Sequence, residues 1–168
     1  MDDLLRAGGY PGARGRAPGR RRDAWFDSYV DTLVQRDLRD LADLERLADR
    51  PRLLRLLATR GGSLVNYADL ARTMGFPKTT LARYTTLLET LFLVRTVPAW
   101  YTSRVKRLVK SPKLMFPDGG LLAHLTGLPA DAATADRQAW GGQVKNFAWG
   151  ELLKQRQWSE TARCSGSS

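Results

Sequence analysis

One stretch limits the fold more than any other, because residues 66–100 read in the order helix, turn, helix, strand. Asn66, with Asp69 three residues later, is typical of a helix N-terminus, where a short polar side chain accepts backbone N–H groups. Gly75 can adopt the positive φ of a tight turn. Apolar residues then recur at helical spacing before the apolar segment FLVRTV. This order predicts a helix-turn-helix followed by a β-strand.

A second apolar segment, KLMF, follows that strand after a dense run of basic residues. Five Lys and Arg fall within residues 104–113. If the two apolar segments pair as antiparallel strands, the basic run becomes the connection between them, which is the wing of a winged-helix domain. From Gly61 to Asp118 there are nine basic and three acidic residues, so more than half of the net charge of +10 lies here.

This charge predicts a nucleic-acid interface made of the second helix and the wing. Phosphate contacts in such domains come from basic and hydroxyl side chains. The expected nucleic-acid-binding residues are Lys78, Thr79, Thr80 and Arg83 on the helix, with Arg104, Lys106, Arg107 and Lys110 on the wing. A solvated wing, or one that faces an acidic protein surface, is the alternative explanation of the same residues.

The composition of the chain also bears on its partners, its cofactors and its location. The chain has 27 Lys and Arg against 17 Asp and Glu, and this excess favours a polyanionic partner such as DNA. A single cysteine and a single histidine provide no zinc ligand set, so we expect no metal and no cofactor. No apolar run approaches the ~18 residues of a membrane span, and no signal-peptide pattern is present. We therefore expect a cytoplasmic protein without a membrane partner.

The chain also divides by composition into segments. Residues 8–22 hold five Gly, two Pro and five Arg without an acid, so residues 1–22 are expected to be a flexible basic segment. Residues 23–60 form a helical region, with apolar residues at three- and four-residue steps from Phe26 to Leu44. Residues 61–118 form the winged helix-turn-helix.

Several blocks of the sequence together resemble a known family. These blocks are GGYP, WFDSYVDTLVQRDLRDLADL, LLRLLATRGGSLVNYADLARTMG, TTLARYTTLLETLFLVRTVPAW and KRLVKSPKLMFPDGGLLAHLTGL. Their order resembles the domain of unknown function that follows the ATPase module in prokaryotic AAA-type ATP-binding proteins. The resemblance runs from about residue 8 to about residue 160, and KRLVKSPKL followed by Asp118, Gly120 and Leu121 is its most specific part.

The resemblance implies an N-terminal P-loop ATPase, then the helical and winged-helix region, then a C-terminal α/β part similar to restriction endonucleases. The fold class expected here is therefore mostly α: a helical region and a winged helix-turn-helix, with the remnant of that α/β domain. On this basis residues 119–160 would be the start of the truncated α/β domain, and residues 161–168 a disordered tail. No G-x-x-x-x-G-K-[ST] phosphate loop occurs in the chain, so we expect no ATP hydrolysis.

The C-terminal part departs from the resemblance in ways that argue against catalysis. QVKNFAWGELLKQRQWSE resembles the helix that opens the nuclease-like part, but Lys145 stands where relatives usually have Glu. Only Glu151 matches the acidic set, and a metal-dependent phosphodiesterase needs several convergent carboxylates. We expect no enzyme and no catalytic residue. The aromatic residues here, Trp140, Phe147, Trp149 and Trp158, are expected to leave an apolar patch.

The sequence thus predicts a non-catalytic DNA-binding or regulatory module, with DNA and a AAA-type ATPase module as partners. One alternative is a free-standing winged-helix transcription regulator, which would bind specific duplex sites as a dimer. Another is a fragment of a metal-dependent nuclease whose remaining strands come from another chain, and a third is a gene fragment produced by a frameshift. The oligomeric state is open.

Overall fold

The computed structural model describes residues 2–37, 50–99, 111–129 and 136–165. As expected, the described chain is mostly helical. The helices are α1 (Asp2–Ala7), α2 (Pro11–Arg14), α3 (Arg20–Asp37), α4 (Arg50–Ala58), α5 (Tyr67–Met74), α6 (Lys78–Thr90), α8 (Gly119–Thr126) and α9 (Arg137–Ser165). The strands are β1 (Ser63–Leu64), β2 (Arg95–Val97) and β3 (Lys113–Met115).

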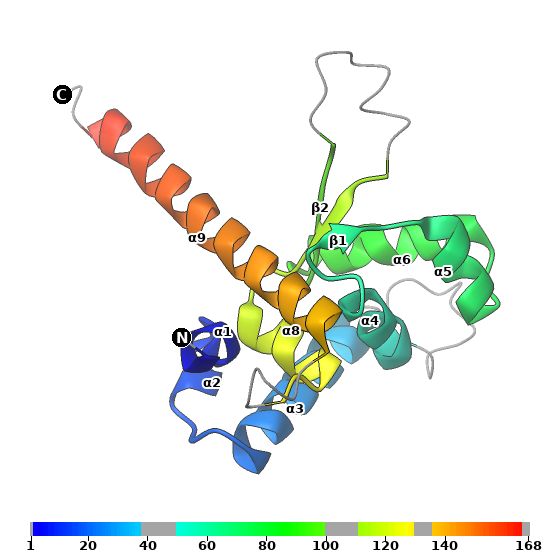
Figure 1. Cartoon of the computed structure of the whole chain (residues 1–168), viewed down its shortest axis with the longest axis horizontal. Coiled ribbons are helices and arrows are strands. Elements are labelled where there is room, and N and C mark those ends of the chain that lie inside the picture. The colour runs from blue at the N-terminus through cyan, green and yellow to red at the C-terminus, as the bar shows by residue number, and fades with distance from the viewer. Residues whose placement is uncertain (1, 38–49, 100–110, 130–135, 166–168) are drawn as a thin grey trace.

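The three strands form one small antiparallel sheet in the order β1-β3-β2. Leu114 in the central strand pairs with Thr96 of β2 and with Ser63 of β1. The predicted antiparallel pairing of the two apolar segments is therefore confirmed. Figure 1 shows α5 and α6 together at one side of the molecule and the long helix α9 projecting from the other.

A single apolar core joins the helices to the sheet. Its buried members come from α2, α3, α4, α5, α6, β3, α8 and adjoining loops, and the largest of them include Phe26, Leu54, Leu70, Leu81, Phe116 and Leu121. Residues from both sides of position 118 thus share one core, and α8 packs against α1, α4 and α9. No helix in the described part is both long and apolar enough to cross a membrane.

The N-terminal segment differs from the flexible segment expected for residues 1–22. The chain forms α1 and α2 there, and Leu5 and Ala13 are fully buried. Tyr10 packs its ring 4.8 Å from that of Tyr29 and 5.8 Å from that of Trp25, measured between ring centroids. Three apolar side chains are therefore enough to dock this segment, because Leu5 and Ala13 are buried and Tyr10 joins an aromatic cluster.

Two helix boundaries also differ from those that the sequence predicts. The helix predicted from residue 23 begins three residues earlier, at Arg20, and is described as far as Asp37; its predicted continuation to Leu44 lies outside the described residues. At the other end, α9 runs to Ser165 through part of the expected disordered tail. The described residues between 119 and 160 include α8 and most of α9, and α8 belongs to the common core.

Three buried polar side chains, which we call the polar clamp, tie α9 and α8 to the rest of the chain. The clamp consists of Asp118, Gln143 and Asn146. The Asn146 amide accepts from the Phe116 N–H at 2.7 Å and donates to the Phe116 carbonyl at 2.8 Å. One side chain thereby satisfies both polar groups of a buried residue at the end of β3.

The other two clamp residues hold the N-terminal segment. The Gln143 amide nitrogen donates to the carbonyl oxygens of Leu5 and Gly119, the latter at 2.7 Å. The Asp118 carboxylate caps α8 by accepting from the Leu121 N–H at 2.7 Å, and it also accepts from the Gly9 N–H. Asp118 is thus a helix N-cap that is shared with a distant segment.

Gly120 allows the end of α1 to lie close to the start of α8. A Cβ atom added at Gly120 would lie 2.9 Å from the Gly8 nitrogen and 3.0 Å from the Ala7 carbonyl oxygen. No side chain fits between the end of α1 and the start of α8. Figure 1 shows α1 lying beside α8 and α9, as this contact requires.

The aromatic residues of α9 are distributed between the body and solvent. Trp140, Phe147 and Trp149 are half-buried, whereas Trp158 is 72% exposed and Leu152 is 65% exposed. Trp158 and Leu152 lie on the outer part of the helix, where α9 stands clear of the rest of the molecule (Figure 1). The inner part of α9 packs on α8 and α1.

We predict that Asn146→Ala lowers the free energy of unfolding by about 2–5 kcal/mol, because it leaves the buried N–H and carbonyl of Phe116 without partners. Gln155→Ala, which removes an exposed amide from the same helix, is the matched control and should change it by less than about 0.5 kcal/mol. Urea unfolding followed by circular dichroism measures both values. Equal values for the two variants would show that the clamp does not stabilise the fold.

We also predict a pH dependence that arises from Tyr10. Burial raises the pKa of this phenol, and its hydrogen bond to Tyr29 raises the pKa further. Above about pH 10 the unfolded chain releases this proton while the folded chain retains it, so stability falls as the pH rises. The fall in unfolding free energy between about pH 9 and about pH 11 should be smaller in Tyr10→Phe. Identical pH profiles for the wild type and the variant would contradict the assignment.

Candidate nucleic-acid interface

Helices α5 and α6 and the turn between them have the local geometry that their sequence predicts. The Asn66 side chain accepts from the N–H groups of Ala68 at 3.0 Å and Asp69 at 3.3 Å, which caps α5. Gly75 ends α5 with φ of 68°, in the left-handed region that favours glycine. The next N–H, from Phe76, then bonds to the Ala71 carbonyl at 3.1 Å. The predicted cap and turn are both confirmed.

Helix α6 has one face in the core and one face toward solvent. Leu81, Tyr84 and Leu88 are buried, along with Thr85, whose hydroxyl donates to the Leu81 carbonyl. This face fixes the rotation of the helix about its axis. The opposite face is consequently presented to the outside over its whole length.

The four helical residues predicted to bind nucleic acid lie in the first two turns of α6. Lys78, Thr79 and Arg83 are exposed, and Thr80 is half-buried. Thr79 and Arg83 are four residues apart and therefore share one face. The first turn contains no acidic residue, and Pro77 at the N-cap provides no side-chain hydrogen bond to the free N–H groups. This end of α6 is thus positively polarised.

The four predicted wing residues, Arg104, Lys106, Arg107 and Lys110, lie outside the described residues. Two exposed cations on the adjoining strands are described: Arg95 on β2 and Lys113 on β3. Arg95 was not among the predicted site residues. The sequence signal that could have identified Arg95 is its place next to Thr96 in the predicted strand. A strand with one buried face presents every second residue to solvent.

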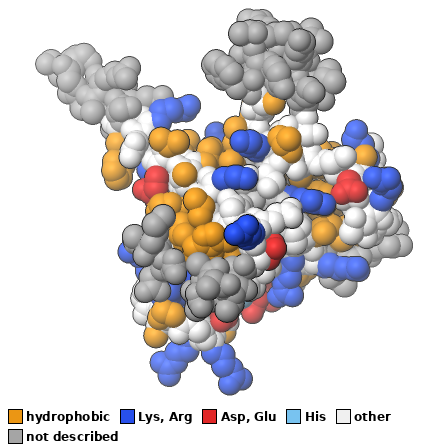
Figure 2. Space-filling model, viewed as in Figure 1, with side chains coloured by type: hydrophobic (Ala, Val, Ile, Leu, Met, Phe, Trp, Pro, Cys, Tyr) orange, Lys and Arg blue, Asp and Glu red, His pale blue; other side chains and the backbone are white. Residues whose placement is uncertain are grey.

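The acidic residues of this region are already engaged. Asp69 forms ion pairs with Arg60 at 3.1 Å and with Arg72 at 3.3 Å. Glu89 accepts from the N–H and hydroxyl of Thr96 at 2.6 and 2.7 Å, and Asp118 is buried in the polar clamp. Within the described residues, no ion pair involves the exposed cations Lys78, Arg83, Arg95 and Lys113. Figure 2 shows Lys and Arg spread over one face of the molecule with few Asp and Glu between them.

The connection from α6 to β2 holds the helix and the hairpin in a fixed relation. The Phe92 N–H bonds to the Glu89 carbonyl at 3.0 Å, and the Leu93 N–H bonds to the Leu88 carbonyl at 2.9 Å. These two bonds form a Schellman cap, in which the buried Leu93 packs near the buried Leu88. The cap position is normally glycine, yet Phe92 occupies it with φ of 56° and 76% exposure.

Glu151 and His124 both have charged partners in the structure. Glu151 pairs with Lys154 at 2.7 Å on the surface of α9. His124 lies between two aspartates of α3, with its ring nitrogens 3.4 Å from Asp23 and 3.0 Å from Asp27. Among the described residues, no group of three or more His, Cys, Asp and Glu is placed to hold a metal ion.

Comparison with known proteins identifies the family. A domain of unknown function, DUF8612, matches residues 1–132 of the chain. The chain belongs to this family. Two uncharacterized proteins, from Mycobacterium tuberculosis and Mycobacterium bovis, are each 31% identical over 151 residues, which is 90% of this chain. The match covers 34% of each relative, so the chain spans about a third of their length. No solved structure matches.

The Schellman cap generates a prediction about stability. Replacing Phe92 by glycine should raise the free energy of unfolding by about 0.5–1 kcal/mol, because a left-handed backbone conformation is unfavourable for residues with a Cβ atom. The exposed ring loses little buried area in this change. Phe92→Ala keeps the unfavourable conformation and serves as the control. A glycine variant no more stable than the alanine variant in thermal or urea unfolding would show that the cap is unstrained.

Proposed function

We propose that this chain is a non-catalytic DNA-binding or regulatory module, and that residues 61–118 act as a winged helix-turn-helix. The order β1, α5, α6, β2, β3 and the antiparallel β2–β3 pair support this proposal, because they follow the arrangement of that domain class. The observation that carries it is the set of exposed cations on α6 and the hairpin strands, whose neighbouring acids are all engaged elsewhere.

The proposed contacts are to the phosphate backbone. Lys78 and Arg83 at the start of α6 would approach one strand, and the hydroxyls of Thr79 and Thr80 would donate to phosphate oxygens. Arg104, Lys106, Arg107 and Lys110 on the proposed wing would contact the backbone beside them. Such contacts fix position and carry little sequence information, so we expect binding that is sensitive to salt and tolerant of sequence.

We further propose a AAA-type ATPase module as a partner. The resemblance to the region that follows such modules supports this part of the proposal, and the relatives are long enough to contain one, since the match fills about a third of each. In this arrangement the helical region and the winged helix would transmit the state of the ATPase to the bound DNA. The chain itself would bind and regulate rather than catalyse.

The proposal predicts the salt dependence of DNA binding. Fluorescence polarisation with a labelled mixed-sequence duplex should give an affinity that falls as salt rises. In a plot of the logarithm of the binding constant against the logarithm of the salt concentration, each lost phosphate contact makes the slope less steep by about one. The variant Lys78→Ala with Arg83→Ala should therefore reduce the slope by about two, and substitution of all four wing residues by alanine should reduce it by up to about four.

The control variant removes the same charge elsewhere. Arg21→Ala with Arg52→Ala takes two exposed cations from α3 and α4 and should leave the slope unchanged. Equal losses in the control and the α6 variant would mean that only net charge matters, and negligible binding by the wild type would overturn the DNA proposal. A strong preference for one duplex sequence would instead favour the transcription regulator.

A further inference from the structure

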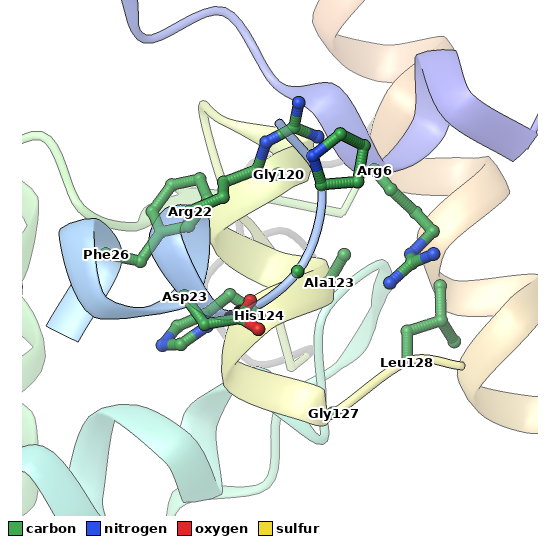
Figure 3. Close-up of a pocket in the computed structure, with 11 residues that line it drawn as sticks. Arg6, Arg22, Asp23, Phe26, Gly120, Ala123, His124, Gly127 and Leu128 are labelled. Carbon is green, nitrogen blue, oxygen red and sulfur yellow. Dashed lines mark hydrogen bonds and ion pairs between the residues drawn. The ribbon is translucent and has the colours of Figure 1, made fainter. Parts of the chain in front are cut away.

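A cavity of about 390 Å³ lies among α1, α3 and α8, formed by elements outside the proposed DNA interface. Arg6 of α1 and Arg22, Asp23 and Phe26 of α3 line it together with Ala123 and His124 of α8 (Figure 3). Its volume falls within the range of small-molecule pockets, roughly 300–1,000 Å³. It is large enough for a metabolite-sized ligand.

Two arginines from different helices line this cavity. The Nε atoms of Arg6 and Arg22 are both buried and have no hydrogen-bond partner in the described part of the chain. Arg22 uses another nitrogen, Nη2, to donate to the Arg16 carbonyl at 2.8 Å. Two guanidinium groups beside one cavity suit a single anionic ligand, because their positive charges repel each other when no anion lies between them.

The acid in the cavity wall does not neutralise them. Asp23 points its carboxylate at His124, with Oδ1 3.4 Å from Nδ1, and the other ring nitrogen of His124 lies 3.0 Å from Asp27. Figure 3 shows Asp23 and His124 together at one end, with the guanidinium groups of Arg6 and Arg22 away from them. The arginine side of the cavity is therefore cationic.

We propose that this cavity binds a small ligand that carries an oxyanion, either a phosphate or a carboxylate group. The planar guanidinium donates two parallel N–H bonds to such groups, which makes arginine the residue best matched to them. Arg6 and Arg22 would hold the oxyanion from two different helices. Phe26 and Ala123 provide an apolar wall for the remainder of the ligand.

The test uses inorganic phosphate and succinate as probes, one for each source of the oxyanion, at constant ionic strength. Thermal unfolding should show that at least one probe raises the melting temperature of the wild type by about 2–4 °C at a saturating concentration. The shift should be lost in Arg6→Gln and in Arg22→Gln. It should persist in Arg21→Gln, which removes an exposed cation next to Arg22 on the same helix.

A second measurement separates binding from structural roles. Without a probe, Arg6→Gln should melt no lower than the wild type, because it removes one of two like charges that line the same cavity. Far-ultraviolet circular dichroism checks that each variant is folded. The proposal is overturned if neither probe shifts the wild type, if the shift survives in Arg6→Gln, or if Arg21→Gln loses it equally.

Discussion

The polar clamp is the constraint on which the rest of the structure depends. A helix that packs only through apolar side chains can slide or rotate, whereas Asn146 fixes α9 at one residue by matching both polar groups of Phe116. Gln143, one turn earlier, fixes the same helix to the N-terminal segment, and Asp118 joins that segment to α8. Because all three residues are buried, each bond is costly to break. Segments more than one hundred residues apart are thereby held in a single core.

This constraint also positions the surfaces to which we assign function. The clamp anchors the end of β3, and β3 is the central strand that orients the hairpin and, through it, α6. The cationic ends of α6 and the hairpin strands are consequently presented from a rigid base. The cavity lined by Arg6 and Arg22 lies where α1 and α3 meet α8.

The sequence predicts those parts of the fold that depend on local chemistry. Asn66 and Gly75 have strong intrinsic preferences for a cap and a left-handed turn, so they locate α5 and α6 without tertiary information. The clamp residues could not be predicted in this way, because Gln143 and Asn146 are of types that usually face solvent on a helix. The N-terminal helices were missed for a related reason, since Leu5 and Ala13 become informative only once their distant partners are known. The site residues on α6 follow from periodicity, but the cavity lined by Arg6 and Arg22 arises from packing alone.

The central claim, that α6 and the hairpin form a DNA interface, is tested most directly by hydrogen exchange measured by mass spectrometry with and without a mixed-sequence duplex. We predict slower exchange in peptides that cover the start of α6 and the strands β2 and β3, with no change in α9. These amides would be shielded by the phosphate backbone if the proposed contacts form. Unchanged exchange in α6 and the hairpin at a saturating concentration of duplex, or protection confined to α9, would contradict the account.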